Sequence, residues 1–108
     1  MPYDPHLADL MREALADRHD IQEKKMFGGY CWMLNGNMLC GVEVGRYMFR
    51  VGKEQEAEAL TRPGTEPVVF NERKMGGIIW VNADECLDAG IEEWISFASN
   101  FVGGLPPK

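Results

Sequence analysis

A run of closely spaced turn signals between residues 24 and 51 constrains the fold of this chain most. Gly-Gly, Asn-Gly and Gly-Arg pairs interrupt segments rich in aromatic and β-branched residues, KKMFGGYCWMLNGNMLCGVEVGRYMFRV. Connections this short join antiparallel strands, because a parallel crossover needs roughly a dozen residues or more. We therefore predict three consecutive antiparallel strands, at about 24–34, 37–43 and 46–51.

Helical patterns flank this stretch. Asp4 followed by Pro5 predicts an N-cap and first turn of a helix to about residue 18, with apolar residues at three- and four-residue spacing. A short helix closed by Pro63-Gly64 comes next, then strands at 66–71 and 76–82, and a last helix capped by Asp88. The order α-β-β-β-α-β-β-α predicts an α+β fold, a two-layer single domain over 1–108 with helices on one face of an antiparallel sheet.

The Asn35-Gly36 turn predicts which strand residues share a face of the sheet. A two-residue turn there sets Cys31 opposite Cys40 and Trp32 opposite Leu39. Strand side chains alternate between faces, so one face is wholly apolar and is assigned to the core beneath the helices. That predicted core face holds Cys31, Met33, Met38, Cys40, Val42, Tyr47, Phe49 and Val51.

The opposite face of these strands mixes aromatic and apolar groups with two arginines. A solvated face is usually more polar, and aromatic and arginine side chains are enriched at interface hot spots. We therefore predict that this face meets a partner, either in a homodimer or in a complex with another protein. The predicted interaction face comprises Tyr30, Trp32, Leu39, Arg46, Met48 and Arg50.

Four sulfur-bearing residues lie almost symmetrically about the same turn: Cys31, Met33, Met38 and Cys40. Thiolate and thioether ligands suit soft ions such as copper(I), but no Cys-x-x-Cys or Cys/His spacing accompanies them. A cross-strand disulfide is a second reading and ordinary core packing a third. We predict core packing, with no metal and no cofactor.

The sequence contains no recognisable catalytic set. His6 and His19 are the only histidines and are predicted to lie on the surface. Neither Gly-Gly pair fits a phosphate-binding motif, so both are assigned to bulges or sheet edges. The basic pairs Lys24-Lys25 and Arg73-Lys74 are read as solvated edge charges. The protein is therefore predicted not to be an enzyme.

Charge and cysteine content indicate where the chain works. Eleven basic and seventeen acidic residues give a net charge of −6, which disfavours nucleic acid and anionic membranes as partners. Three cysteines, an odd number, suit a reducing compartment, and neither a signal peptide nor a membrane span is recognised. A cytoplasmic location is expected.

Three features of the chain occur together: KKMFGGY with the hairpin after it, RVG with a short helix after it, and the closing LPPK. The most specific part is Met26 to Gly29. These features give a resemblance to the TfoX/Sxy N-terminal domain family, and most of all to its short stand-alone bacterial members. It implies a compact α+β domain with an antiparallel sheet and offers no catalytic residue to transfer. Stand-alone relatives commonly have Met-Arg-Gly where this chain has Met75-Gly76-Gly77, so no function is carried to that position.

Two functional hypotheses follow. The first is a non-enzymatic cytoplasmic domain that works through protein–protein contacts in a regulatory role. The alternative is a small-molecule-binding domain, or an enzyme of unknown reaction, with a pocket lined by Trp32, Tyr30 and Arg50.

Overall fold

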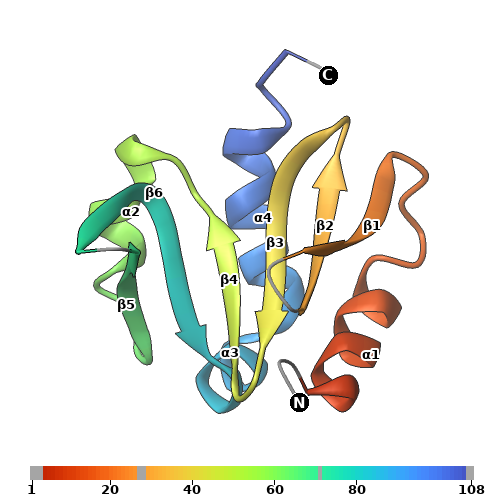
Figure 1. The fold of residues 1–108 in the computed structure, drawn as a ribbon, viewed down its shortest axis with the longest axis horizontal. Helices are drawn as coiled ribbons and strands as arrows, with labels where there is room; N and C mark the ends of the chain where they lie inside the picture. The colour runs from red at the N-terminus through yellow and green to blue at the C-terminus, as the bar shows by residue number, and fades with distance from the viewer. Residues whose placement is uncertain (1–3, 27–28, 71, 107–108) are drawn as a thin grey trace.

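The structure is a computed structural model that describes residues 4–26, 29–70 and 72–106. It confirms the predicted fold class: an antiparallel sheet packs against helices in an α+β domain (Figure 1). Over these described residues, the order of elements has one more strand and one more helix than predicted. The elements are α1 (Pro5–Ala14), β1 (Ile21–Met26), β2 (Gly29–Leu34), β3 (Asn37–Glu43), β4 (Arg46–Arg50), α2 (Lys53–Ala59), β5 (Thr65–Phe70), β6 (Arg73–Asn82), α3 (Ala83–Ala89) and α4 (Ile91–Val102).

The six strands form one sheet in the order β1-β2-β3-β4-β6-β5, and every neighbouring pair is antiparallel. Hairpins join β1 to β4 in sequence, as the turn signals predict. The chain then leaves the sheet through α2 and returns as β5 at the edge, with β6 inserted next to β4. In Figure 1, α4 lies behind β3 and β4, on the face that holds the core.

The extra strand arises because the predicted strand at 24–34 is in fact two strands. β1 and β2 pair along their whole length, with Met26 opposite Gly29, so the chain reverses between these two residues. The glycine pair at 28–29 is the signal for this reversal, since glycine permits the backbone angles of tight turns. Phe27 and Gly28, and with them the bulge predicted there, lie outside the described residues.

The extra helix arises at the end of β6. The Asn82 side chain accepts hydrogen bonds from the backbone N–H groups of Asp84 and Glu85, which makes it an N-cap. The prediction that Asp88 caps the last helix is wrong, because Asp88 lies inside α3. The chain turns again at Gly90, which has φ 103°, and α4 begins at Ile91.

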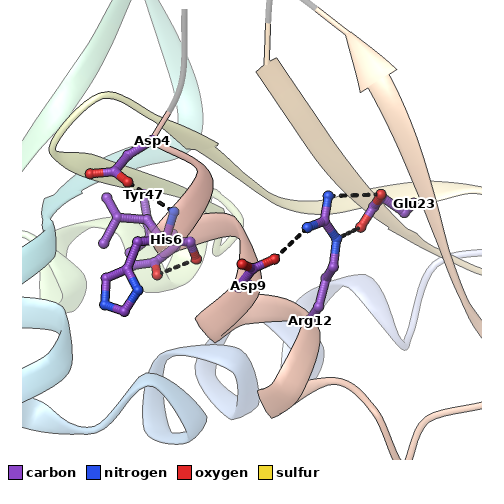
Figure 2. Close-up of polar contacts among 7 residues, drawn as sticks. Asp4, His6, Asp9, Arg12, Glu23 and Tyr47 are labelled. Atoms are coloured by element: carbon purple, nitrogen blue, oxygen red, sulfur yellow. Dashed lines mark hydrogen bonds and ion pairs between the residues drawn. The ribbon is translucent and has the colours of Figure 1, made fainter. Parts of the chain in front are cut away.

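The N-terminal helix starts as predicted and ends earlier. Asp4 Oδ1 accepts from the backbone N–H of His6 at 2.9 Å, and the helix ends at Ala14 instead of near residue 18. Buried Tyr47 holds α1 to the sheet by donating its hydroxyl to the Leu7 carbonyl oxygen at 2.7 Å. At the other side of α1, Arg12 forms ion pairs with Asp9 and with Glu23 of β1 (Figure 2).

The core lies between the sheet and the helices. Tyr47 and Phe49 of β4 and Val51 after it are fully buried, as predicted, and Phe49 stacks on Trp94 of α4 with ring centroids 5.6 Å apart. β6 adds Ile79 to the same core. The face of the sheet that carries these residues is called the helix face below.

Gly52, at the start of α2, permits a close approach to α4. Its φ is 82°, and a Cβ atom built there would lie 2.4 Å from Cδ1 of Phe101. We predict that Gly52→Ala lowers the free energy of unfolding by at least about 2 kcal/mol, because left-handed strain and overpacking each cost about 1–2 kcal/mol or more. Urea unfolding followed by circular dichroism measures the change.

A control for this prediction is Gly45→Ala. Gly45 has a similar φ of 76°, but a Cβ atom there meets nothing within 4 Å, so only the backbone strain remains. Adding Phe101→Ala to Gly52→Ala should recover part of the loss, since the clash partner is gone. Equal losses for the two single glycine variants would contradict the packing argument.

Candidate interaction face

A β-bulge in the β2–β3 hairpin decides which side chains lie on the face of the sheet opposite the helices. The turn is as predicted: Asn35 and Gly36 both have positive φ, and Met33 pairs with Met38. Beyond that pair the register shifts, so that Trp32 pairs with Cys40 and Leu39 is the extra residue. The residues of β2 therefore lie on the opposite face to the one predicted for them.

The correction removes half of the predicted interaction face. Trp32 is 2% exposed and Leu39 is fully buried, and both belong to the core beneath the helices. Tyr30 also lies on the helix face, where it is partly buried against the core and beneath Arg12 of α1. Only Arg46, Met48 and Arg50 lie where they were predicted, on the face that no described helix covers. The pocket predicted between Trp32, Tyr30 and Arg50 therefore does not form.

The physical reason for the shift is burial of apolar area. The bulge brings Trp32, Leu34 and Leu39 into the core in place of Cys31, Met33 and Met38. Two leucines and a tryptophan remove more apolar surface from water than one cysteine and two methionines. A signal was present in the sequence: a lone glycine inside a strand, Gly41, is typical of a bulge or of a close backbone approach.

The bulge also separates the four sulfurs. Cys40 lies on the helix face with its Sγ 3.8 Å from Sδ of Met11. Cys31 lies on the other face, opposite Gly41, where a Cβ atom would lie 3.2 Å from Cys31 Sγ and 3.3 Å from Met48 Cε. The predicted Cys31–Cys40 pairing is wrong, and the two thiols cannot form a cross-strand disulfide.

All three cysteines are free and buried. Burial raises the pKa of Cys40, which is fully enclosed, above that of an ordinary thiol. Burial likewise raises the pKa of Cys86, to about 12, and the pKa of Cys31. These thiols are therefore held in the protonated, poorly nucleophilic form at neutral pH.

The face opposite the helices, called the open face below, combines sulfur and aromatic side chains with charges. Pairing across β2, β3, β4 and β6 places its members together, and the central ones are partly buried by their neighbours. The open face comprises Cys31, Met33, Met38, Met48, Ile78 and Trp80, with Lys24, Glu43, Arg46, Arg50 and Glu66 among and around them.

Arg46 organises one half of the open face. Its guanidinium lies 3.7 Å from the ring centroid of Trp80 and forms ion pairs with Glu43 at 2.8 Å and Glu66 at 2.9 Å. Exposed pairs of this kind contribute little to stability individually, about 0–1 kcal/mol. Together they fix the orientation of Trp80, which is the largest apolar side chain of this face.

Trp80 and Ile78 were missed from the sequence, although their strand was predicted. Alternation along β6 places them opposite to buried Ile79 and Val81. What the sequence does not show is that β6 inserts next to β4, which sets Trp80 opposite Met48. That neighbour relation skips α2 and β5 and is set by tertiary structure.

Comparison with known protein families gives a match for this chain. A family model described as TfoX N-terminal domain matches residues 13–98. The chain belongs to the TfoX N-terminal domain family. The matched range begins inside α1 and ends inside α4, so the complete sheet and the open face are parts of this TfoX N-terminal domain. No curated protein and no solved structure gives a significant match to it.

The structure also bears on the histidines, on metal binding and on membrane-spanning helices in this TfoX N-terminal domain. His6 and His19 are exposed, as predicted. Among the described residues, no three His, Cys, Asp or Glu side chains are grouped so that they could hold a metal ion. Within the same residues, no helix has both the length and the apolar character needed to cross a membrane.

The second glycine pair, Gly76-Gly77, lies at an irregularity in the pairing of β5 with β6, which agrees with the predicted bulge. Gly77 has φ 82° and accepts, through its carbonyl oxygen, from the backbone N–H groups of Val51 at 2.8 Å and Gly52 at 3.0 Å. The glycine pair thus joins β6 to the segment between β4 and α2. It holds the two backbones together at a point where side chains would keep them apart.

Proposed function

We propose that this TfoX N-terminal domain acts through protein–protein contacts in a regulatory role and catalyses no reaction. The contact surface is the open face, and its occupant is the open face of a second copy of the chain. The observation that carries the proposal is the group of partly buried Met33, Met38, Met48 and Trp80 on the side of the sheet that no described helix covers.

The composition of the open face supports a protein partner. Tryptophan, methionine and arginine are the residue types enriched in the centres of protein interfaces. Methionine side chains are flexible and polarisable, so they adapt to an opposing surface. A sheet covered by helices on one face only also leaves its second face available for packing against another sheet.

The charge distribution favours a second copy of the chain. The open face carries three basic and two acidic side chains, so two such faces can pair opposite charges across a twofold axis. Elsewhere the domain is acidic, and two copies repel each other there. The acidic residues exposed on the helices are Asp9, Glu13, Glu54, Glu58, Asp84, Glu85, Asp88, Glu92 and Glu93.

The test is the oligomeric state of the wild type and of Trp80→Ala, measured by sedimentation equilibrium. We expect a wild-type dimer, and a dissociation constant at least about thirtyfold higher for the variant, since truncating a central interface tryptophan typically costs about 2 kcal/mol or more. Truncation also removes the ring on which Arg46 lies.

The matched control is Leu87→Ala on α3. Leu87 is 39% exposed and lies away from the open face, so its truncation should leave the dissociation constant unchanged. A wild type that stays monomeric at the highest attainable concentration would show that the open face does not bind a second copy. Equal effects of the two variants would show that the dimer uses another surface.

A further inference from the structure

A cavity of about 440 Å³ opens where three distant segments of the chain meet. The segments are the end of β4 with the start of α2, the glycine pair of β6, and the end of α4. The lining residues are Arg50, Gly52, Lys53, Glu54, Gly76, Gly77 and Phe101. Its volume falls within the range of about 300–1,000 Å³ that is usual for small-molecule sites.

The floor of this cavity is fixed by hydrogen bonds of the backbone. The Gly77 carbonyl oxygen accepts from Val51 and Gly52, and the Gly77 N–H donates to Oε1 of Glu56 at 3.0 Å. Glu56 is only 8% exposed, so a nearly buried carboxylate is used to hold this crossing of two backbones. A binding site on such a floor needs little reorganisation when a ligand arrives.

The room in the cavity depends on the absence of side chains from its glycines. A Cβ atom on Gly77 would lie 3.1 Å from the backbone of Gly52 and Lys53, and one on Gly76 would lie 3.1 Å from Cε of Lys53. Phe101 supplies an aromatic wall, with the Arg50 guanidinium 5.6 Å from its ring centroid. The cavity therefore combines an apolar wall with a charged rim.

The charged residues that line the cavity are two basic ones, Arg50 and Lys53, and one acidic one, Glu54, in a chain of net charge −6. Three of the other arginines, Arg12, Arg46 and Arg62, are each paired with a carboxylate, whereas Arg18 donates a hydrogen bond to Oγ of Ser99. In the part of the chain that the structure describes, neither Arg50 nor Lys53 has a carboxylate within ion-pair distance. Two cations at one cavity, each without an acidic partner, attract an anionic group.

We propose that this cavity binds a small organic anion. A carboxylate or phosphate group of the ligand is held between Arg50 and Lys53, and an apolar, planar part of the same ligand lies against Phe101. The guanidinium and the ammonium donate charge-assisted hydrogen bonds to the anion. The site adjoins the open face at Arg50, which belongs to both, whereas Lys53, Gly76 and Phe101 are not members of the open face.

The test uses phenyl phosphate, benzoate, inorganic phosphate and phenol as probes, with amide chemical shifts of ¹⁵N-labelled protein as the readout. We expect phenyl phosphate, benzoate or both to shift the amides of Gly52, Lys53, Gly76 and Gly77 in a saturable way. Inorganic phosphate should bind more weakly at the same amides, because it lacks the apolar part. Neutral phenol should leave them unshifted.

The variant Lys53→Gln should weaken binding of the better organic anion about tenfold or more, since a hydrogen bond to a charged group is worth about 1.5–3 kcal/mol. Lys25→Gln on β1 changes the net charge equally and should leave binding unchanged. Tighter binding of phenyl phosphate than of benzoate would assign the site to phosphate monoesters, and the reverse order to carboxylates. Absence of saturable shifts at these amides, or equal losses for the two lysine variants, would overturn the proposal.

Discussion

Replacing Trp32 by alanine is expected to lower the free energy of unfolding by about 3–5 kcal/mol, the usual cost of truncating a buried tryptophan. Trp32 is 2% exposed and packs within the core on the helix face. Domains of this size are stabilised by about 5–15 kcal/mol in total, so the variant should melt far below the wild type. Urea and thermal unfolding followed by circular dichroism measure the loss.

Trp80→Ala is the matched control, because it removes the same side chain from the opposite face of the same sheet. Trp80 is only partly buried, so a smaller loss of stability is expected for the monomer. If Trp32→Ala does not fold at all, Trp32→Phe keeps the comparison possible with a smaller cavity. Equal losses of stability for Trp32→Ala and Trp80→Ala would contradict the bulged register of the β2–β3 hairpin.

Raising the pH above neutral is expected to lower the free energy of unfolding by a large amount. Cys40 and Cys86 have folded-state pKa values that burial raises, to about 12 for Cys86, whereas an unfolded thiol titrates near 8.5. Their protonated state therefore contributes stability that is present below about pH 8.5 and is lost as the pH rises toward the folded-state pKa. By about pH 10, each thiol should have lowered the free energy of unfolding by about 2 kcal/mol, and the two thiols together by about 4 kcal/mol.

The measurement is the urea midpoint of the wild type between neutral pH and pH 10, against that of the double variant Cys40→Ala/Cys86→Ala. The double variant should show a distinctly shallower decline, whatever stability its small cavities cost at neutral pH. Val81→Ala, which truncates the same core without removing a thiol, should retain the wild-type decline. Parallel curves for the wild type and the double variant would show that the two thiols titrate alike in the folded and unfolded states.

The bulge at Leu39 separates two of the thiols. Cys40 stays in the core, where it was predicted, and Cys31 lies instead on the open face near Met48. The β2–β3 hairpin, whose sequence suggested a cluster of four sulfurs, therefore places these sulfurs on two different faces of the sheet. The same displacement moves Trp32 away from the open face, whose largest aromatic side chain is Trp80 of β6.

Local signals in the sequence determined the class of the fold and several of its boundaries. The Asn35-Gly36 turn, the Asp4 cap and the buried alternation of Tyr47, Phe49 and Val51 all depend on neighbours a few residues away, and each lies where it was predicted. Backbone preferences and side-chain period are properties of short segments, so they can be read without knowing the rest of the chain. The same reasoning identified the glycine pair at 76–77 as a place where the pairing of β5 with β6 is irregular.

Only the tertiary structure decided which face each β2 residue occupies and which strands are neighbours. Inserting one bulge residue exchanges the two faces of a strand, and the choice depends on how much apolar area the helices can cover. The pairing of β6 with β4, and the approach of Gly77 to Gly52 and of Gly52 to Phe101, join residues far apart in sequence. Such contacts are selected by the free energy of the whole packed core, and no short segment contains that information.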